Sequence, residues 1–431
     1  MTDFRSEPVP DLTVSVTGLG YVGLPAALAF ASKYHVIGYD HSAERVAMLR
    51  ERKDPSGAVA PEAFACADVE FSSSPDAIVK ANFHIVATPT PVDSNKEPDL
   101  SLQKDAMRAI GKRLKRGDAV VVESTVYPGC VEEDLLPILE DESGLHVDSD
   151  FHLGYSPERI NPGDPRHTFT TVRKVVAART PEALDLVARA YQSVISAEVF
   201  RASSIKAAEA AKIIENTQRD VNIALMNELS LILSRMGIET SDVLEAASTK
   251  WNFLPFHPGL VGGHCIGVDP YYLDYKAKEI GYHTQIISKG RYVNDSMGCY
   301  VAKETVKRLL DGGGDVSQMR ILVMGLTYKE NVQDVRNTRS VDIVNELRSF
   351  GIGEIDIVDP VASKTDAMSL YGIEPHDDAV GVYDAIVVAV SHAQFRTLGQ
   401  EFFDAHLRKG GVLTDVYSLF RSVKGFNIWS L

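Results

Sequence analysis

The chain has 431 residues, of which 45% are hydrophobic and 24% are charged, and its formal net charge at pH 7 is −15. This length and composition predict a globular protein of two or three domains. The negative charge disfavours a general role in binding nucleic acid or anionic membranes, although it does not prevent a helix start from binding a small anionic nucleotide.

We expect a cytoplasmic protein without a signal peptide, a membrane span or a metal site. The N-terminal residues M-T-D-F-R-S-E-P-V-P lack an apolar core. No apolar run approaches the roughly 18 residues that a membrane helix needs. The four cysteines show no C-x-x-C spacing, and no two of the twelve histidines lie four residues apart. Neither a disulfide framework nor a zinc site is therefore indicated.

The first predicted elements surround a glycine-rich turn. A β-rich run over residues 12–17 precedes Gly18-Leu-Gly20-Tyr21-Val22-Gly23, and an alanine-rich helix over 24–32 and a strand over 35–39 follow, ending at Asp40. In such a fingerprint the first glycine makes the turn, the second admits a pyrophosphate and the third lets the helix pack on the strand. The stretch predicts a dinucleotide site formed by Gly18, Gly20, Tyr21, Val22 and Gly23.

Asp40 lies 22 residues after Gly18, where a carboxylate can accept hydrogen bonds from both ribose hydroxyls. Because it would repel the 2′-phosphate of NADP, Asp40 favours NAD as the cofactor. Arg45 could reach the phosphates or could be an ordinary solvated helix residue. A glycine turn in an unrelated α/β fold is the alternative, which the agreement of strand, helix and acid disfavours.

Three polar clusters follow predicted strands. The strand over 83–87 runs into T-P-T-P, the strand over 119–122 runs into E-S-T, and a short strand precedes the G-Y-S-P-E-R that ends at Arg159. Because the carboxyl ends of parallel strands face the ligand crevice, we expect these loops to converge there. Each cluster could also be simple turn chemistry, since Thr, Ser and Pro are frequent in turns.

One long helix is predicted over residues 204–236, which contain neither proline nor glycine. Ser203 or Ser204 can cap its start, and Gly237 is a natural stop. At about 1.5 Å per residue it spans about 48 Å, which suits a connector with one apolar face left for a partner subunit. Lys212 and Asn216 share a face of this helix, where a cation and an amide can stabilise an oxyanion or can simply be solvated.

The stretch over 251–273 reads W-N-F-L-P-F-H-P-G-L-V-G-G-H-C-I-G-V-D-P-Y-Y-L. Gly262 and Gly263 stand just before Cys265, and Asp269 follows four residues later. Glycines let a backbone approach a ligand closely, so a thiol at this place can meet a substrate atom. A single cysteine is more often a small buried hydrophobic residue. The two glycines and the carboxylate nevertheless point to Cys265 as a covalent catalyst.

The last third of the chain repeats the α/β pattern, with strands predicted over 320–324, 354–358, 384–390 and 411–414. Its first turn has one glycine, Gly325, where the first half has three, so a second pyrophosphate-binding loop is disfavoured. Lys329 could bind a nucleotide diphosphate instead. We therefore predict an α/β fold with two Rossmann-like doubly wound domains joined by a long central helix.

The string G-G-H-C-I-G-V-D-P resembles the catalytic loop of the nucleotide-sugar 6-dehydrogenases, the UDP-glucose/GDP-mannose dehydrogenase family. The stretch over 251–273 is most similar to the branch that oxidises UDP-N-acetylhexosamines, including the enzyme of Vi-type capsule synthesis. The likeness covers about residues 11–420. It implies an NAD-binding domain over 1–198, a helical dimerisation domain with the catalytic loop over 199–300, and a UDP-binding domain over 301–431. It also implies a homodimer or higher homo-oligomer.

The resemblance also assigns site residues. Its implied cofactor contacts, beyond the glycine turn, Asp40 and Arg45, are Pro89, Thr90, Thr125 and Arg336. Its implied substrate contacts are Glu158, Arg159, Lys212, Asn216, Phe256, Gly259, Gly262, Arg291, Tyr328 and Lys329. For Arg291 an ordinary helix salt bridge is an alternative. Val416-Tyr417 departs from the family, which has a lysine there, and this puts the phosphate contacts at that end in doubt.

The implied reaction is a four-electron oxidation of C6 of a UDP-N-acetylhexosamine by two NAD and one water. Cys265 would add to the intermediate aldehyde, and the resulting thioester would be hydrolysed. Lys212 and Asn216 would stabilise the oxyanion. Asp269 would act as base through a water held by Thr125. Glu158 would assist hydrolysis or position Lys212.

Several alternatives stay open at the level of sequence. UDP-N-acetylmannosamine, UDP-glucose or GDP-mannose could be the substrate. The UDP-glucose branch tends to carry a lysine just before the acid that matches Asp269, whereas this chain has Val268. A single-step β-hydroxyacid-type dehydrogenase shares the first α/β half and the Lys-x-x-x-Asn helix. A catalytically idle nucleotide-binding dimer is the alternative from another class.

Overall fold

The computed structural model describes residues 7–431 apart from 56, 58, 66, 161–163 and 165. The first six residues, on which part of the signal-peptide prediction rests, and Cys66 lie outside the described residues. The chain forms two compact units, Met1–Glu215 with Tyr271–Tyr282 and Asn216–Pro270 with His283–Leu431. The boundaries predicted at residues 198 and 300 stay a prediction. In the described part of the chain, no helix is long and apolar enough to cross a membrane.

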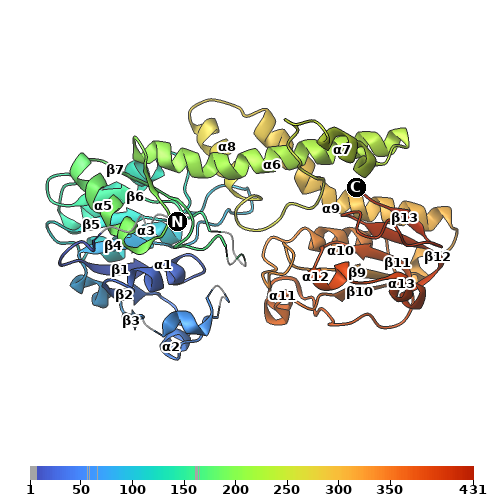
Figure 1. Cartoon of the computed structure of the whole chain (residues 1–431), viewed down its shortest axis with the longest axis horizontal. Helices are drawn as coiled ribbons and strands as arrows, with labels where there is room; N and C mark the ends of the chain where they lie inside the picture. Colours follow the sequence, from blue (N-terminus) through green and yellow to red (C-terminus); the bar gives the residue numbers. More distant parts are fainter. Residues whose placement is uncertain (1–6, 56, 58, 66, 161–163, 165) are drawn as a thin grey trace. The chain divides into compact units, whose positions relative to one another are not determined.

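The first unit is built on an eight-stranded sheet in the order β3-β2-β1-β4-β5-β6-β7-β8 (Figure 1). All neighbours run parallel except β6 and β7. The first six positions follow the order of dinucleotide-binding sheets. The strands are β1 (Thr13–Thr17), β2 (His35–Tyr39), β3 (Val69–Ser72), β4 (Phe83–Val86), β5 (Ala119–Val122), β6 (His152–Tyr155), β7 (Lys174–Ala178) and β8 (Val199–Arg201).

Helices of the first unit cover this sheet. One core cluster joins the sheet to α1 and α5, where the rings of Phe30 and Tyr191 meet edge-on with centroids 5.2 Å apart. Burial of such aromatic side chains contributes much of the energy of a core. The helices are α1 (Gly23–Phe30), α2 (Ala43–Arg50), α3 (Ser101–Gly111), α4 (Leu136–Ser143) and α5 (Pro181–Val194), with short turns η1 (Pro61–Phe64), η2 (Pro75–Lys80) and η3 (Val131–Leu135).

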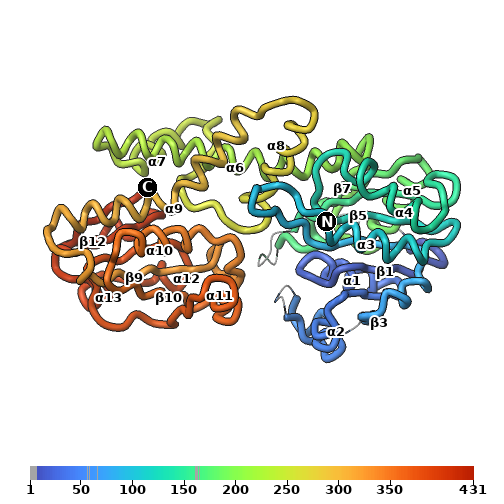
Figure 2. Tube along the Cα trace, turned by 180° about the vertical axis from the view of Figure 1, so that it is seen from behind, coloured from blue at the N-terminus to red at the C-terminus, as the bar shows by residue number. Residues whose placement is uncertain are grey.

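The predicted long helix is confirmed as α6 (Ile205–Met236), and its trace can be followed in Figure 2. The hydroxyl of Ser204 accepts a hydrogen bond from the backbone N–H of Ala207 at 3.1 Å, which caps the start. Gly237 follows the last turn with a φ of +70°, a conformation that glycine adopts without strain. Three further helices follow, α7 (Thr240–Ser248), α8 (Asp269–Glu279) and α9 (Ile286–Asp311).

The second unit is built on a five-stranded parallel sheet in the order β10-β9-β11-β12-β13. Both faces of this sheet are buried, and alternate residues of β9 pack on opposite faces. Ile321 and Val323 belong to a core shared with α9 and α10, whereas Leu322 and Met324 belong to a core shared with α12 and α13. The elements are β9 (Arg320–Met324), β10 (Glu354–Val358), β11 (Tyr383–Val388), β12 (Leu407–Asp415), β13 (Asn427–Trp429), α10 (Ser340–Ser349), α11 (Lys364–Tyr371), α12 (Ala393–Arg396), α13 (Gln400–His406) and η4 (Val316–Gln318).

The α/β fold with two Rossmann-like sheets and a long central helix is therefore confirmed. Among the elements that were predicted, the differences lie at the element ends. The strand predicted to precede Gly154 contains it, because β6 keeps its pairing to β5 as far as Tyr155. The strand predicted over 411–414 extends in both directions as β12.

Candidate active site

The three glycines of the first turn meet different surroundings. Gly18 has a φ of +90°, and a Cβ there would lie 2.9 Å from the carbonyl oxygen of Ala87. At Gly23 a Cβ would lie 1.8 Å from the carbonyl oxygen of Gly18, so α1 packs directly on the turn. At Gly20 a Cβ would meet no atom within 4 Å. The outer glycines thus allow close packing, and the middle one leaves the open approach that a pyrophosphate needs.

Asp40 follows β2 and is 7% exposed. One carboxylate oxygen accepts a hydrogen bond from the N–H of Leu19 at 2.9 Å, and the other accepts one from the N–H of Ser42 at 2.9 Å. Because a carboxylate oxygen accepts more than one hydrogen bond, both can still receive a ribose hydroxyl. The guanidinium of Arg45 lies 3.8 Å from this carboxylate. The turn and the acid therefore fit NAD.

The loop after β4 is held by Gln103, a side chain that the sequence analysis missed. Its amide donates hydrogen bonds to the carbonyl of Pro89 at 2.7 Å and to the hydroxyl of Thr90 at 2.5 Å. The hydroxyl of Ser124 donates to the carbonyl of Thr88 at 2.7 Å. Gln103 is fully buried. Its one sequence signal is a polar residue within the apolar stripe of α3.

Glu158 lies in a buried ion network. One of its oxygens lies 3.0 Å from the ammonium of Lys174, and the other accepts hydrogen bonds from the N–H groups of Arg159 and Ile160 at 2.6 and 2.7 Å. Lys174 also lies 3.4 Å from Glu123, whose pKa is raised by burial. One lysine thus balances two buried carboxylates. The sequence analysis did not find Lys174.

Lys212 and Asn216 lie four residues apart in α6. Lys212 is 8% exposed, which excludes the alternative of a solvated surface lysine. The amide of Asn216 donates a hydrogen bond to the carboxylate of Asp269 at 2.5 Å. Asp269 is 2% exposed and begins α8, and its N–H donates to the carbonyl of Cys265 at 2.8 Å. The predicted amide, acid and thiol residues of the second unit are therefore neighbours.

The two glycines before Cys265 fit against another loop of the second unit. A Cβ on Gly262 would lie 2.6 Å from the carbonyl oxygen of Asn337, and one on Gly263, whose φ is +82°, would lie 2.6 Å from the ring of Tyr328. The sequence suggested that these glycines approach a ligand. In the structure they approach the segment with Tyr328 and Asn337, beside a half-buried, unbridged Cys265.

His264 precedes the thiol and was not predicted. Burial lowers the pKa of its imidazole to about 4, and the charge of Arg336 acts in the same direction. The ring lies 3.7 Å from Asp334. The pKa of Tyr328, whose ring lies against Gly263, is raised to about 12 by burial and by Cys265. A neutral imidazole therefore adjoins the thiol residue at physiological pH.

Asp359 follows β10 as Asp40 follows β2, but its carboxylate is used differently. It is fully buried and accepts hydrogen bonds from the N–H groups of Leu326 and Thr327 at 2.6 and 3.0 Å, and it lies 3.1 Å from the imidazole of His392. The other ring nitrogen of His392 accepts from the N–H of Asn331 at 2.9 Å. The pair thus fixes the loop that carries Tyr328 and Lys329.

Two predicted arginines pair with acids. Arg291 is 2% exposed and lies 2.5 Å from Asp220, and it pairs with Asp295 one helical turn away. This is the helix salt bridge that the sequence left open. Arg336 makes a bidentate pair with Asp334 at 2.9 and 2.7 Å. The predicted contacts of both arginines with nucleotides stay predictions.

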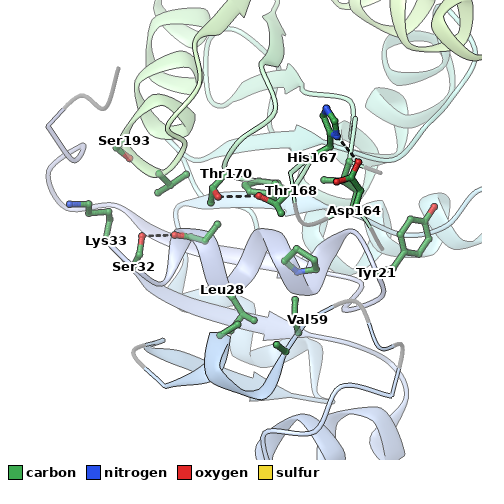
Figure 3. Close-up of a pocket in the computed structure, with 17 residues that line it drawn as sticks. Tyr21, Leu28, Ser32, Lys33, Val59, Asp164, His167, Thr168, Thr170 and Ser193 are labelled. Carbon is green, nitrogen blue, oxygen red and sulfur yellow. Dashed lines mark hydrogen bonds and ion pairs between the residues drawn. The ribbon is translucent and has the colours of Figure 1, made fainter. Parts of the chain in front are cut away.

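A cavity of about 530 Å³ runs along the outer side of α1. Figure 3 shows Ser32 and Lys33 near one end of it and the Asp164–His167 pair near the other, with 2.6 Å between carboxylate and imidazole. Tyr21 is the one predicted site residue among the described residues that line the cavity. The ranges that the structure describes contain no cluster of three or more His, Cys, Asp or Glu suited to a metal ion.

Comparisons with known proteins cover nearly the whole chain. Residues 12–195, 206–296 and 322–422 match the NAD binding, central and UDP binding domains of the UDP-glucose/GDP-mannose dehydrogenase family. UDP-N-acetyl-D-glucosamine 6-dehydrogenase of Pseudomonas aeruginosa is 52% identical over 393 residues, covering 91% of this chain and 93% of that protein. Its namesake from Salmonella typhi is 46% identical over 395 residues, with the same coverage. A solved structure of UDP-D-ManNAc dehydrogenase from Pyrococcus horikoshii, 28% identical, superposes with a TM-score of 0.86 over 97% of this chain and 99% of that one.

Proposed function

Because the chain belongs to the UDP-glucose/GDP-mannose dehydrogenase family, we propose that it oxidises C6 of a UDP-N-acetylhexosamine, UDP-GlcNAc or UDP-GalNAc, to the carboxylate. The names of the relatives at 52% and 46% identity support UDP-GlcNAc. The reaction consumes the C6 alcohol, two NAD⁺ and one water, and it yields the carboxylate, two NADH and three protons. Each of the two NAD molecules, when bound, accepts one of the two hydrides that leave C6.

The observation that carries the proposal is the grouping of Asn216, Asp269 and Cys265, with the Asn216 amide 2.5 Å from the Asp269 carboxylate. The Cys265 thiolate adds to the C6 aldehyde, forming a C–S bond and an oxyanion. That oxyanion expels the second hydride to give a thioester, and water breaks the C–S bond to release the acid. Lys212 and Asn216 stabilise the oxyanion.

Asp269 serves as the base, and Thr125 holds the water through which it acts. Glu158 assists hydrolysis or positions Lys212. The ion pair with Lys174 occupies one carboxylate oxygen of Glu158 and two backbone amides occupy the other, so the carboxylate is held in one place for either role.

Binding is divided between the two α/β halves. We assign NAD to Gly18, Gly20, Tyr21, Val22, Gly23, Asp40, Arg45, Pro89, Thr90, Thr125 and Arg336. We assign the UDP-sugar to Glu158, Arg159, Lys212, Asn216, Phe256, Gly259, Gly262, Arg291, Tyr328 and Lys329. The open space over Gly20 and the loop fixed by Asp359 and His392 support these assignments.

The protein acts in the cytoplasm as a homodimer or higher homo-oligomer and supplies a uronic acid for a surface polysaccharide. Apolar side chains left exposed along α6, namely Ile214, Leu225, Ile232 and Met236, support self-association. Light scattering measures the mass in solution, and a monomer at micromolar concentration would contradict the oligomer.

The covalent route is tested with Cys265→Ala, by counting NADH formed per sugar consumed. We expect two for the native chain and a loss of acid formation in the variant, because no thioester can form. A variant that still makes acid at two NADH per sugar would refute the covalent route. One NADH per sugar from the native chain would favour the single-step dehydrogenase. No turnover at all would favour the idle nucleotide binder.

The substrate itself is tested by NADH formation with UDP-GlcNAc, UDP-GalNAc, UDP-ManNAc, UDP-glucose and GDP-mannose. We expect the highest kcat/KM with one of the first two. A preference for UDP-ManNAc, UDP-glucose or GDP-mannose would assign the chain to another branch of the family.

A further inference from the structure

Two asparagines of α6 hold the catalytic loop, one on each side of Cys265. Asn216 donates to Asp269, four residues after the thiol. Asn227 bonds Gly259, six residues before it. The two asparagines are 11 residues apart, which is about three helical turns, so they point from the same face of the helix. Both ends of the loop that carries Cys265 are therefore hydrogen-bonded to the same helix, α6.

The contact of Asn227 with Gly259 is a matched pair of hydrogen bonds. The side-chain amide donates to the carbonyl of Gly259 at 3.0 Å, and its oxygen accepts from the N–H of Gly259 at 2.8 Å. Asn227 is fully buried. On the far side, a Cβ on Gly259 would lie 3.1 Å from the ring of Tyr417. The backbone at Gly259 is thus confined from two directions.

A buried polar chain fixes the orientation of the Asn227 amide. This amide donates to the oxygen of Asn294 at 2.8 Å, and the Asn294 amide donates to Asp220 at 2.7 Å. Asp220 in turn lies 2.5 Å from the buried Arg291. Because Asn294 uses its own amide to bond Asp220, it offers only its oxygen to Asn227. A buried polar network of this kind favours one arrangement of its side chains.

The same network makes a second contact with the loop, at Val261. Arg291 pairs with Asp295, and Asp295 pairs with Arg339. The guanidinium of Arg339 donates to the carbonyl of Val261 at 3.3 Å. The loop is therefore tied at Gly259 and at Val261 to side chains whose own positions are fixed by buried charges.

We propose that Asn227 is a positioning residue, which sets the register of the catalytic loop on α6 and thereby the place of the Cys265 sulfur. The proposal rests on the proposed function of Cys265 as nucleophile. A nucleophile acts efficiently only when the reacting atoms lie about 3–3.5 Å apart, and a displacement of about 1 Å can reduce the rate about 100-fold. Loss of Asn227 should therefore slow formation of the thiohemiacetal more than it weakens ligand binding.

The test compares Asn227→Ala and Asn227→Asp with Asn222→Ala. The aspartate has nearly the same shape and keeps the acceptor for the Gly259 N–H but loses the donor to its carbonyl. Asn222 is a half-buried residue of the same helix, and its amide donates within α6 to the carbonyl of Gln218 at 2.6 Å. It controls for loss of an asparagine amide from the helix.

Each purified full-length variant is assayed for kcat and KM, for NADH per sugar with a carbonyl trap for free aldehyde, and for the rate of Cys265 alkylation by iodoacetamide. For Asn227→Ala we expect kcat to fall about 10- to 100-fold, with KM for NAD within about twofold. We also expect NADH per sugar to fall from two towards one, and alkylation to change by more than about threefold. Asn227→Asp should be intermediate, and Asn222→Ala should match the native chain.

An Asn227→Asp variant with native kcat, two NADH per sugar and native alkylation would overturn the proposal. The proposal would also be overturned if the loss of activity were accompanied by equal losses in melting temperature and NAD affinity. Such a result would indicate a general structural defect. If the native chain itself does not give two NADH per sugar, the proposed function fails. The alkylation rates still report whether Asn227 places the thiol.

Discussion

The open space over Gly20 leads to a prediction about cofactor binding. In Gly20→Ala, the new methyl group would meet no protein atom within 4 Å, and the backbone is not in the left-handed region. Folding should therefore be unaffected or slightly favoured, by up to about 1 kcal/mol, because alanine restricts the unfolded chain. The methyl would instead occupy the approach of the pyrophosphate. We expect Kd for NAD to rise about 10- to 100-fold, which corresponds to about 1.4–2.7 kcal/mol.

The matched control is Gly23→Ala, in the same turn. Its Cβ would lie 1.8 Å from the backbone oxygen of Gly18, far inside an ordinary contact, so α1 must move. We expect a loss of about 3 kcal/mol or more in the free energy of unfolding of the first unit. Calorimetric NAD titration and thermal unfolding measure both effects. Native NAD affinity in Gly20→Ala would refute the argument that the pyrophosphate passes over this residue.

Two further predictions concern side chains that sequence reasoning missed. His392→Leu should raise KM for the UDP-sugar about tenfold with a smaller change in kcat. The reason is that the loop carrying Tyr328 and Lys329 loses the hydrogen bond from the Asn331 N–H to the imidazole. Steady-state kinetics measure both constants, and an unchanged KM would contradict the prediction. Glu209 is fully buried, and burial raises its pKa from 4.5 to about 7, although its carboxylate accepts from the N–H groups of Gly129 and Val131 at 2.6 and 2.9 Å. Between these pH values the folded chain holds a proton that the unfolded chain has lost, so this contribution to stability is present below pH 4.5 and is lost as pH rises through 7. The difference in free energy of unfolding between the native chain and Glu209→Gln should therefore shrink by up to about 3 kcal/mol between pH 4.5 and 7. Denaturant unfolding at several pH values measures this difference. A difference that does not change with pH would show that Glu209 does not titrate in this range.

Sequence patterns indicated the candidate site residues but not the side chains that hold them in place. The glycine turn, Asp40, Cys265 and Asp269 were found because each stands in a local pattern whose spacing follows from a strand, a turn or a helix. Gln103 and Lys174 were not found, because an isolated polar residue in a helix or strand gives no sign of what it will meet. Both are buried against loops or acids that are distant in the sequence.

The sequence by itself determined the strand–turn–helix start of the first unit, the dinucleotide turn and the long helix. These depend on periodicity and on backbone conformations that a few neighbouring residues impose. Only the tertiary structure decided that Arg291 is enclosed by acids, that Asp359 is occupied by amides and His392, and that Asn227 holds the loop before the thiol. The physical reason is that a hydrogen bond or ion pair depends on the distance between two side chains, and residues such as Asn227 and Gly259, 32 positions apart, meet only when their elements pack.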